Sequence, residues 1–88
     1  MAKTIMKKII NGRKYDTTTA TQVCYGFFGN FGCKEVTLYQ KKNGEFFEHH
    51  ELDGKEWIEP VDESEAKRFA EEQMTGDEYE KFFGEVEE

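Results

Sequence analysis

The sequence has few of the residues that mark secreted or disulfide-rich small proteins. It contains two cysteines and one proline in 88 residues. Two cysteines are too few for a disulfide scaffold, so we expect a reduced, cytoplasmic protein, with a Cys24–Cys33 bridge as the minor alternative. Residues 1–10 are interrupted by lysine and lack the apolar core of a secretory signal, and no apolar run reaches the length of a membrane span.

The residue types used in catalysis and metal binding are also scarce. The single serine, Ser64, stands in a helix-start signal, and nothing in the sequence activates either cysteine as a nucleophile. The cysteines and the two histidines match no common zinc spacing, and His49 and His50 point to opposite faces if they lie on one strand. Segment 26–32 lacks the glycine and lysine pattern of a phosphate-binding loop. We therefore expect no enzyme activity, no metal and no cofactor.

Charge is divided unevenly along the chain. The net charge is −7, but residues 1–44 carry eight basic and two acidic side chains, whereas residues 45–88 carry four and seventeen. One interpretation is that both halves are simply solvated. The other is that the acidic half attracts a basic surface, such as the nucleic-acid groove of another protein.

Length and turn signals predict a single α+β domain spanning residues 1–88. Asn11-Gly12, Asn43-Gly44 and Asp53-Gly54 each stand between strand-like runs and have the composition of two-residue type I′ turns. The predicted order is an N-terminal β-hairpin (4–10 and 13–16), a short helix (17–25), a glycine-aromatic loop (26–32), a three-stranded antiparallel meander (35–40, 45–52 and 55–61) and two C-terminal helices (62–75 and 77–84).

Local signals set details of these elements. The first turn places Lys7 opposite Asp16 in the hairpin. Asp62 and Glu65 have the spacing of a capping box at the start of the first C-terminal helix, which we expect Gly76 to stop.

The three predicted turns also determine which meander residues share a face of the sheet. The face expected to seat the first C-terminal helix holds Val36, Leu38, Phe47, His49, Ile58 and Pro60. The opposite face holds Tyr39, Phe46, His50, Leu52 and Trp57. Either the N-terminal hairpin or the Phe-rich loop covers this second face, or Tyr39, Phe46 and Trp57 form an open aromatic patch that anchors a partner.

Two further sets of residues are candidates for binding. Acidic residues on the helices can imitate a row of phosphates and occupy a basic groove; they are Glu63, Glu65, Glu71, Glu72, Asp77, Glu78 and Glu80. Basic and aromatic residues of the hairpin and loop can instead bind nucleic acid directly; they are Lys7, Lys8, Arg13, Lys14, Phe27, Phe28 and Phe31. The net negative charge opposes the second reading, since it repels phosphate.

Three blocks of sequence resemble a family of small uncharacterised proteins from phages and mobile elements of Gram-positive bacteria. The blocks are residues 7–20 (KKIINGRKYDTTTA), residues 37–47 (TLYQKKNGEFF), and residues 63–67 (ESEAK) with 78–85 (EYEKFFGE). Relatives carry a longer insertion where Asp53-Gly54 makes a tight turn here. The resemblance carries no catalytic signature. It implies a mobile-element context, in which small acidic proteins block host defences, CRISPR effectors included.

The sequence therefore predicts a small acidic accessory protein that works in the host bacterial cytosol. It would bind a host protein with a basic surface, such as a CRISPR effector, and inhibit it in the manner of an anti-CRISPR. The alternative is a nucleic-acid-binding module that uses the basic hairpin and the Phe-rich loop. A third hypothesis is a self-associating protein whose basic and acidic halves pair between chains.

Overall fold

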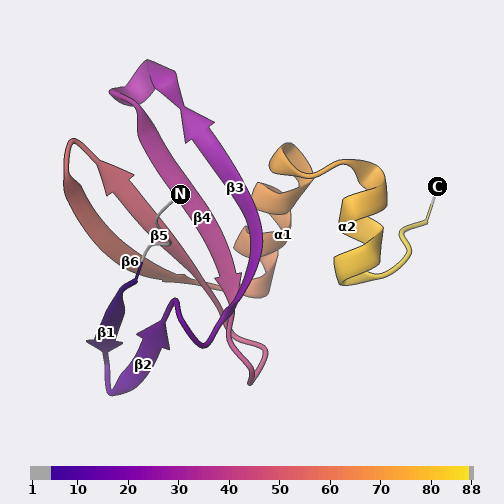
Figure 1. Cartoon of the computed structure of the whole chain (residues 1–88). Helices are drawn as coiled ribbons and strands as arrows, with labels where there is room; N and C mark the ends of the chain where they lie inside the picture. Colours follow the sequence, from indigo (N-terminus) through magenta and orange to yellow (C-terminus); the bar gives the residue numbers. More distant parts are fainter. Residues whose placement is uncertain (1–4, 88) are drawn as a thin grey trace.

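The computed structural model describes residues 5–87, except for the side chain of Phe31. It is an α+β structure (Figure 1) with a two-stranded sheet, β1-β2, and a four-stranded antiparallel sheet in the order β3-β4-β5-β6. The elements are β1 (Lys7–Ile10), β2 (Arg13–Asp16), β3 (Thr21–Phe28), η1 (Gly29–Phe31), β4 (Lys34–Gln40), β5 (Phe46–Leu52), β6 (Lys55–Val61), α1 (Glu63–Gln73) and α2 (Gly76–Phe83).

Two of the three predicted turns have the expected backbone. Asn11 and Gly12 have φ angles of 52° and 76°, and Asp53 and Gly54 have φ angles of 51° and 79°. Positive φ at both central residues is what a type I′ turn requires. These turns join β1 to β2 and β5 to β6, and both hairpins have the predicted register.

The first hairpin begins later than predicted among the described residues. β1 starts at Lys7, which lies opposite Asp16 as expected. The predicted first residue of this strand, Thr4, lies outside the described residues.

The short helix predicted at residues 17–25 is wrong. Strand β3 begins at Thr21 and adds a fourth strand to the meander beside β4. A tight turn precedes it, in which the Asp16 carbonyl accepts the N–H groups of Thr19 and Ala20 at 3.3 and 3.2 Å. β-branched threonines favour extended backbone, and pairing with β4 satisfies the hydrogen-bonding groups of the strand. Residues 26–28, three of the seven in the predicted glycine-aromatic loop, therefore belong to β3.

The turn between β4 and β5 also differs from the prediction. Gly44 has a φ of 95°, but Asn43 does not have a positive φ. The N–H of Gly44 donates to the carbonyl of Lys41 at 2.9 Å, and the N–H of Lys41 donates to the carbonyl of Glu45 at 2.7 Å. The loop therefore contains residues 42–44, one more than a two-residue type I′ turn.

This extra loop residue changes which side chains share a face. Gln40 pairs with Phe46, and Tyr39 pairs with Phe47. A one-residue shift moves every side chain of a strand to the other face, so the predicted grouping of Leu38 with Phe47 is wrong. The face toward the helices holds Val36, Leu38, Phe46, His50 and Trp57, and the opposite face holds Tyr39, Phe47, His49, Ile58 and Pro60.

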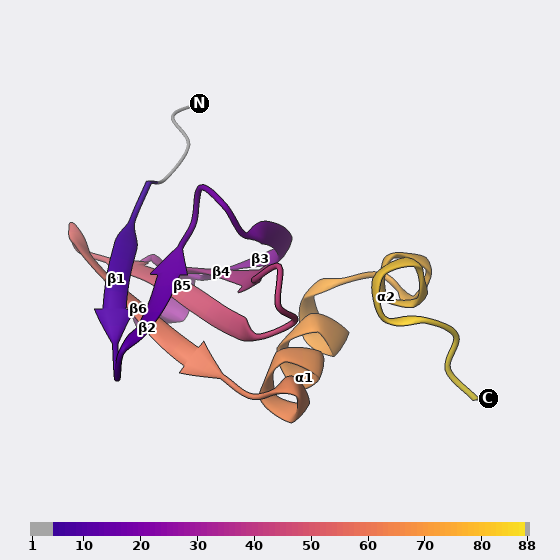
Figure 2. The same cartoon turned by 90° about the horizontal axis from the view of Figure 1, so that it is seen from below.

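The sheet is covered on both faces. Leu38, Phe46, Ala66 and Ala70 form a buried cluster between the sheet and the helices, together with Cys24 of β3. On the other face, the hairpin contributes to a second cluster of Tyr15, Tyr39, Phe47 and Ile58. Figure 2 shows α1 beside the sheet and α2 farther out.

Helix α1 starts at the predicted capping box. The Asp62 carboxylate accepts the N–H of Glu65 at 2.8 Å, and the Glu65 carboxylate accepts the N–H of Asp62 at 3.1 Å. Ala66 and Ala70 are fully buried and form the contact with the sheet. Small side chains at these two positions let the helix backbone lie close to β3 and β5.

The boundary between the two helices differs from the prediction. Gly76 is the first residue of α2, whereas α1 ends at its C-cap, Met74. A second capping box explains this boundary, because Thr75 caps α2 and exchanges hydrogen bonds with Glu78. Gly84 ends α2, as predicted. Neither helix of residues 5–87 has the length and apolar character needed to cross a lipid bilayer.

Candidate functional site

The predicted open aromatic patch is wrong. Tyr39 and Phe46 have exposed fractions of 4% and 6%, and they lie on opposite faces of the sheet. The hairpin covers Tyr39, while Phe83 of α2 lies over Phe46 with ring centroids 5.9 Å apart. Trp57 is half-buried. The expected cover by the hairpin therefore holds for Tyr39, whereas Phe46 is covered by α2, which the prediction did not name.

The basic residues of the hairpin do not form one surface. Neighbouring residues on a strand alternate between faces, so Lys8 and Arg13 lie on the face of the hairpin that packs toward the sheet, and Lys7 and Lys14 lie on the outer face. All four are exposed. The Arg13 guanidinium forms an ion pair with Glu45, so part of the basic charge is already neutralised.

The predicted aromatic loop is also divided. Phe27 has an exposed fraction of 57%, whereas Phe28 is half-buried and lies 6.3 Å from the ring of Phe69 in α1. The side chain of Phe31 lies outside the described part of the structure. Phe27 is therefore the one predicted stacking residue that the described structure shows on the surface.

The acidic residues of the two helices are all exposed, as a partner-binding surface requires. Four of them also have structural roles. Glu65 and Glu78 complete the two capping boxes, Glu63 pairs with Lys67 at 3.2 Å, and the Glu80 carboxylate accepts the N–H of Val86 at 3.2 Å. The remaining members of the predicted set are Glu71, Glu72 and Asp77. Within residues 5–87 these three carboxylates form no ion pair and no side-chain hydrogen bond.

A groove of about 400 Å³ lies where α1 passes into α2. Three carboxylates line it together with apolar side chains; its lining includes Glu71, Asp77, Glu80, Met74, Tyr79 and Val86. Lysine and arginine place an apolar stem along apolar surface and keep the charged head near polar groups. The groove therefore has the composition that suits a basic side chain from a partner.

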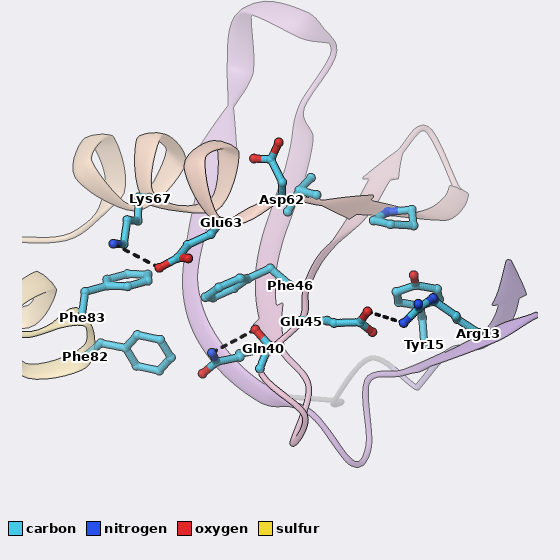
Figure 3. A pocket seen from close by; sticks show the side chains of 13 residues that line it. Arg13, Tyr15, Gln40, Glu45, Phe46, Asp62, Glu63, Lys67, Phe82 and Phe83 are labelled. Carbon is cyan, nitrogen blue, oxygen red and sulfur yellow. Dashed lines mark hydrogen bonds and ion pairs between the residues drawn. The ribbon is translucent and has the colours of Figure 1, made fainter. Parts of the chain in front are cut away.

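A larger open pocket of about 750 Å³ lies between the hairpin, the β4–β5 turn and the helices (Figure 3). Phe46, Phe82 and Phe83 line it on the helix side. Four of its charged side chains form two ion pairs, Arg13–Glu45 and Lys67–Glu63, and a fifth, Asp62, caps α1. Among the described residues, no serine, cysteine or histidine lines this pocket.

The two cysteines are free thiols in different environments. Cys24 is buried and Cys33 is exposed. Burial raises the pKa of the Cys24 thiol to about 11, and the nearby carboxylates of Glu48 and Glu78 act in the same direction. A thiol with such a high pKa is a poor nucleophile at neutral pH, because the thiolate is the reactive form.

The histidines lie on opposite faces of β5, as predicted, and each has a carboxylate partner. His49 Nε2 lies 2.9 Å from Glu56, and His50 Nε2 lies 2.9 Å from Glu48. Around His50 a third group, Glu59, completes a cluster that the sequence analysis did not identify. Two signals could have revealed it: Glu48 and His50 alternate on one strand, and the Asp53-Gly54 turn places Glu59 opposite Glu48.

No protein-family model, no curated protein and no solved structure matches the chain. The resemblance to phage and mobile-element proteins therefore stays a prediction.

Proposed function

We propose that this chain is an accessory protein of a phage or mobile element that binds and inhibits a host protein through the acidic outer surface of α1 and α2. The observation that carries the proposal is the set of exposed carboxylates around the groove between these helices. Glu71 and Asp77 line that groove and form no ion pair with any described residue. A host surface built to hold nucleic acid, such as that of a CRISPR effector, carries the complementary charge.

The groove supports recognition of a basic side chain in particular. Met74 and Tyr79 offer apolar surface for the stem of an arginine or lysine, and Glu71, Asp77 and Glu80 offer acceptors for its charged end. Because the charges of the neighbouring acids act at a distance, we expect rapid association with the partner. The association rate should fall as added salt screens these charges.

The alternative function is a nucleic-acid-binding module on the hairpin and β3. Lys7 and Lys14 share the outer face of the hairpin with Ile9, and Phe27 is exposed on β3. The pairing of Arg13 with Glu45 and the net charge of −7 favour the protein-binding proposal over this one. A gel-shift assay with the Lys7/Lys8/Arg13/Lys14 alanine variant as control distinguishes the two.

Capture from nuclease-treated bacterial lysate, followed by mass spectrometry, tests the proposal. A host protein should be retained by the tagged chain after nuclease digestion and lost with the double variant Glu71→Lys, Glu72→Lys. Recovery of nucleic acid alone, lost on digestion, would instead support the hairpin alternative. Both substituted positions lie in the last turn of α1, where lysine complements the helix dipole, so the fold should survive.

A further inference from the structure

Glu48, His50 and Glu59 bring three metal-ligand atoms together on the helix-facing side of the sheet. Glu48 and Glu59 lie directly opposite each other on β5 and β6, and His50 follows two residues after Glu48. One ligand atom from each residue lies within 4.8 Å of the other two. His50 Nε2 is 2.9 Å from Glu48 Oε1 and 3.4 Å from Glu59 Oε2.

Trp57 holds two members of this cluster in position. Its ring stacks on the His50 imidazole, with centroids 5.1 Å apart and planes 13° apart. Its Nε1–H donates a hydrogen bond to Glu59 Oε1 at 3.1 Å, while Glu59 Oε2 faces His50. In metal sites, the side chains that bind the ion are typically held in place by neighbouring residues that do not touch it.

The charges of the cluster call for a cation. Like charges directly opposite each other on two strands destabilise the pair, and no lysine or arginine among the described residues forms an ion pair with Glu48 or Glu59. Lys34 lies on this side of the sheet, but its Nζ stands over the Trp57 ring at 5.7 Å.

His50 presents Nε2 to the two carboxylates from a buried position. The side chain of His50 is 6% exposed, and its Nδ1 is buried without a hydrogen-bond partner. A metal bound at Nε2 leaves the ring neutral and places the positive charge between the two carboxylates.

We propose that Glu48, His50 and Glu59 form a binding site for a divalent first-row transition metal of the Zn²⁺ type. One imidazole nitrogen and two carboxylate oxygens make a three-ligand set of the kind that leaves a position open to solvent. The ion reaches the site past Glu59, whose side chain is 54% exposed, whereas that of Glu48 is 14% exposed. This site is on the sheet and is independent of the acidic surface of the helices.

Titration with Zn²⁺ tests the proposal, because Trp57 is the only tryptophan and lies against His50. The protein carries Cys33→Ser to remove the exposed thiol, and excess Mg²⁺ occupies scattered surface carboxylates. We expect a saturable change in tryptophan emission and a calorimetric stoichiometry of one ion per chain. Glu59→Gln, which keeps an acceptor for the Trp57 N–H, should weaken binding by at least about tenfold, the loss typical of disturbed metal sites.

Two histidine variants complete the test. His50→Gln should abolish Zn²⁺ binding, while His49→Gln should bind as the parent does, because His49 faces the other side of the sheet and, among residues 5–87, pairs with the carboxylate of Glu56 alone. Circular dichroism establishes whether each variant is folded. If His50→Gln does not fold, Glu59→Gln still tests the site, because residue 59 is exposed. The proposal is overturned if the parent shows no saturable change, if Glu59→Gln binds as tightly as the parent, or if His49→Gln loses binding equally.

Discussion

Tyr15 of the hairpin meets Phe47 of the sheet edge to face, with ring centroids 5.5 Å apart and ring planes at 75°. Both residues are buried, with exposed fractions of 5% and 0%. A two-stranded ribbon is at best marginally stable by itself. This contact, together with Lys41 Nζ 4.3 Å from the centre of the Tyr15 ring, attaches the hairpin to the rest of the protein.

Replacing Tyr15 by alanine should therefore destabilise the whole fold. We expect the free energy of unfolding to fall by about 3 kcal/mol, the usual cost of deleting a buried aromatic ring. Urea denaturation measures it. Ile9→Ala is the matched control on the same hairpin, because Ile9 is 62% exposed and its loss should cost less than about 0.5 kcal/mol. Similar losses for the two variants would mean that Tyr15 does not attach the hairpin.

Two glycines should respond to alanine in opposite directions. A Cβ at Gly26 would lie 2.9 Å from Gln73 Cδ and 3.1 Å from Phe69 Cζ, so in Gly26→Ala the ends of these two side chains must shift, which should cost about 1 kcal/mol. At Gly76, the first residue of α2, a Cβ meets nothing within 4 Å and φ is not positive. Gly76→Ala should stabilise by about 0.5–1 kcal/mol. Thermal unfolding measures the stability of both variants. Stabilisation by Gly26→Ala would contradict the close packing of α1 side chains against β3 at Gly26.

The thiols should differ sharply in reactivity. At pH 8, iodoacetamide should modify Cys33 and spare Cys24, because Cys24 is buried and its pKa is raised to about 11. Mass spectrometry of the intact chain and of its peptides follows the reaction. Both thiols should react in denaturant. Modification of Cys24 first, under native conditions, would show that the contact between the helices and β3 opens readily.

Acid should weaken the β4–β5 turn through Glu45. Hydrogen bonds from Lys41 and then Asn43, with the charge of Arg13, lower the pKa of the Glu45 carboxyl from its ordinary value of 4.5. A lowered folded-state pKa gives stability that is present above pH 4.5 and is lost as the pH falls through the lowered value. Glu45→Gln should therefore flatten the decline of stability between pH 5 and pH 3 in urea denaturation.

A tail variant, Glu85→Gln, controls for the removal of one carboxylate. It should keep the parent's dependence on acid, because Glu85 is exposed beyond the end of α2. If both variants flatten the curve to the same extent, the effect comes from net charge and not from the turn.

The parts of the fold set by local chemistry were predictable from the sequence. Asn11-Gly12 and Asp53-Gly54 predicted two hairpins with their register, and Asp62 with Glu65 predicted the start of α1. The failures lie where longer-range packing decides. Residues 21–28 form a strand because they pair with β4, despite a possible helix cap at Asp16. The β4–β5 loop is longer than the Asn43-Gly44 dipeptide, and the side chains of β4 therefore lie on the opposite face, relative to β5, from the one predicted.

The candidate sites were predictable to a similar degree. Carboxylates at helix spacing identified an exposed acidic surface, since charged side chains on helices rarely become buried. The burial of Tyr39 and Phe46 depends on the hairpin and on α2, which local sequence does not place. The spacing of histidine and cysteine along the chain does not reveal the Glu48–His50–Glu59 cluster, because Glu59 joins it across the β5–β6 pair.

The central claim is that the carboxylates at the end of α1 contact a basic host surface. Its most direct test compares affinity for the captured partner between the parent, Glu71→Lys/Glu72→Lys, and the charge-matched control Glu85→Lys/Glu87→Lys. We predict that the α1 variant loses binding by at least about a hundredfold, as expected when charges of a complementary pair are reversed, while the tail variant changes it little. Equal affinity of the folded α1 variant and the parent would contradict the account.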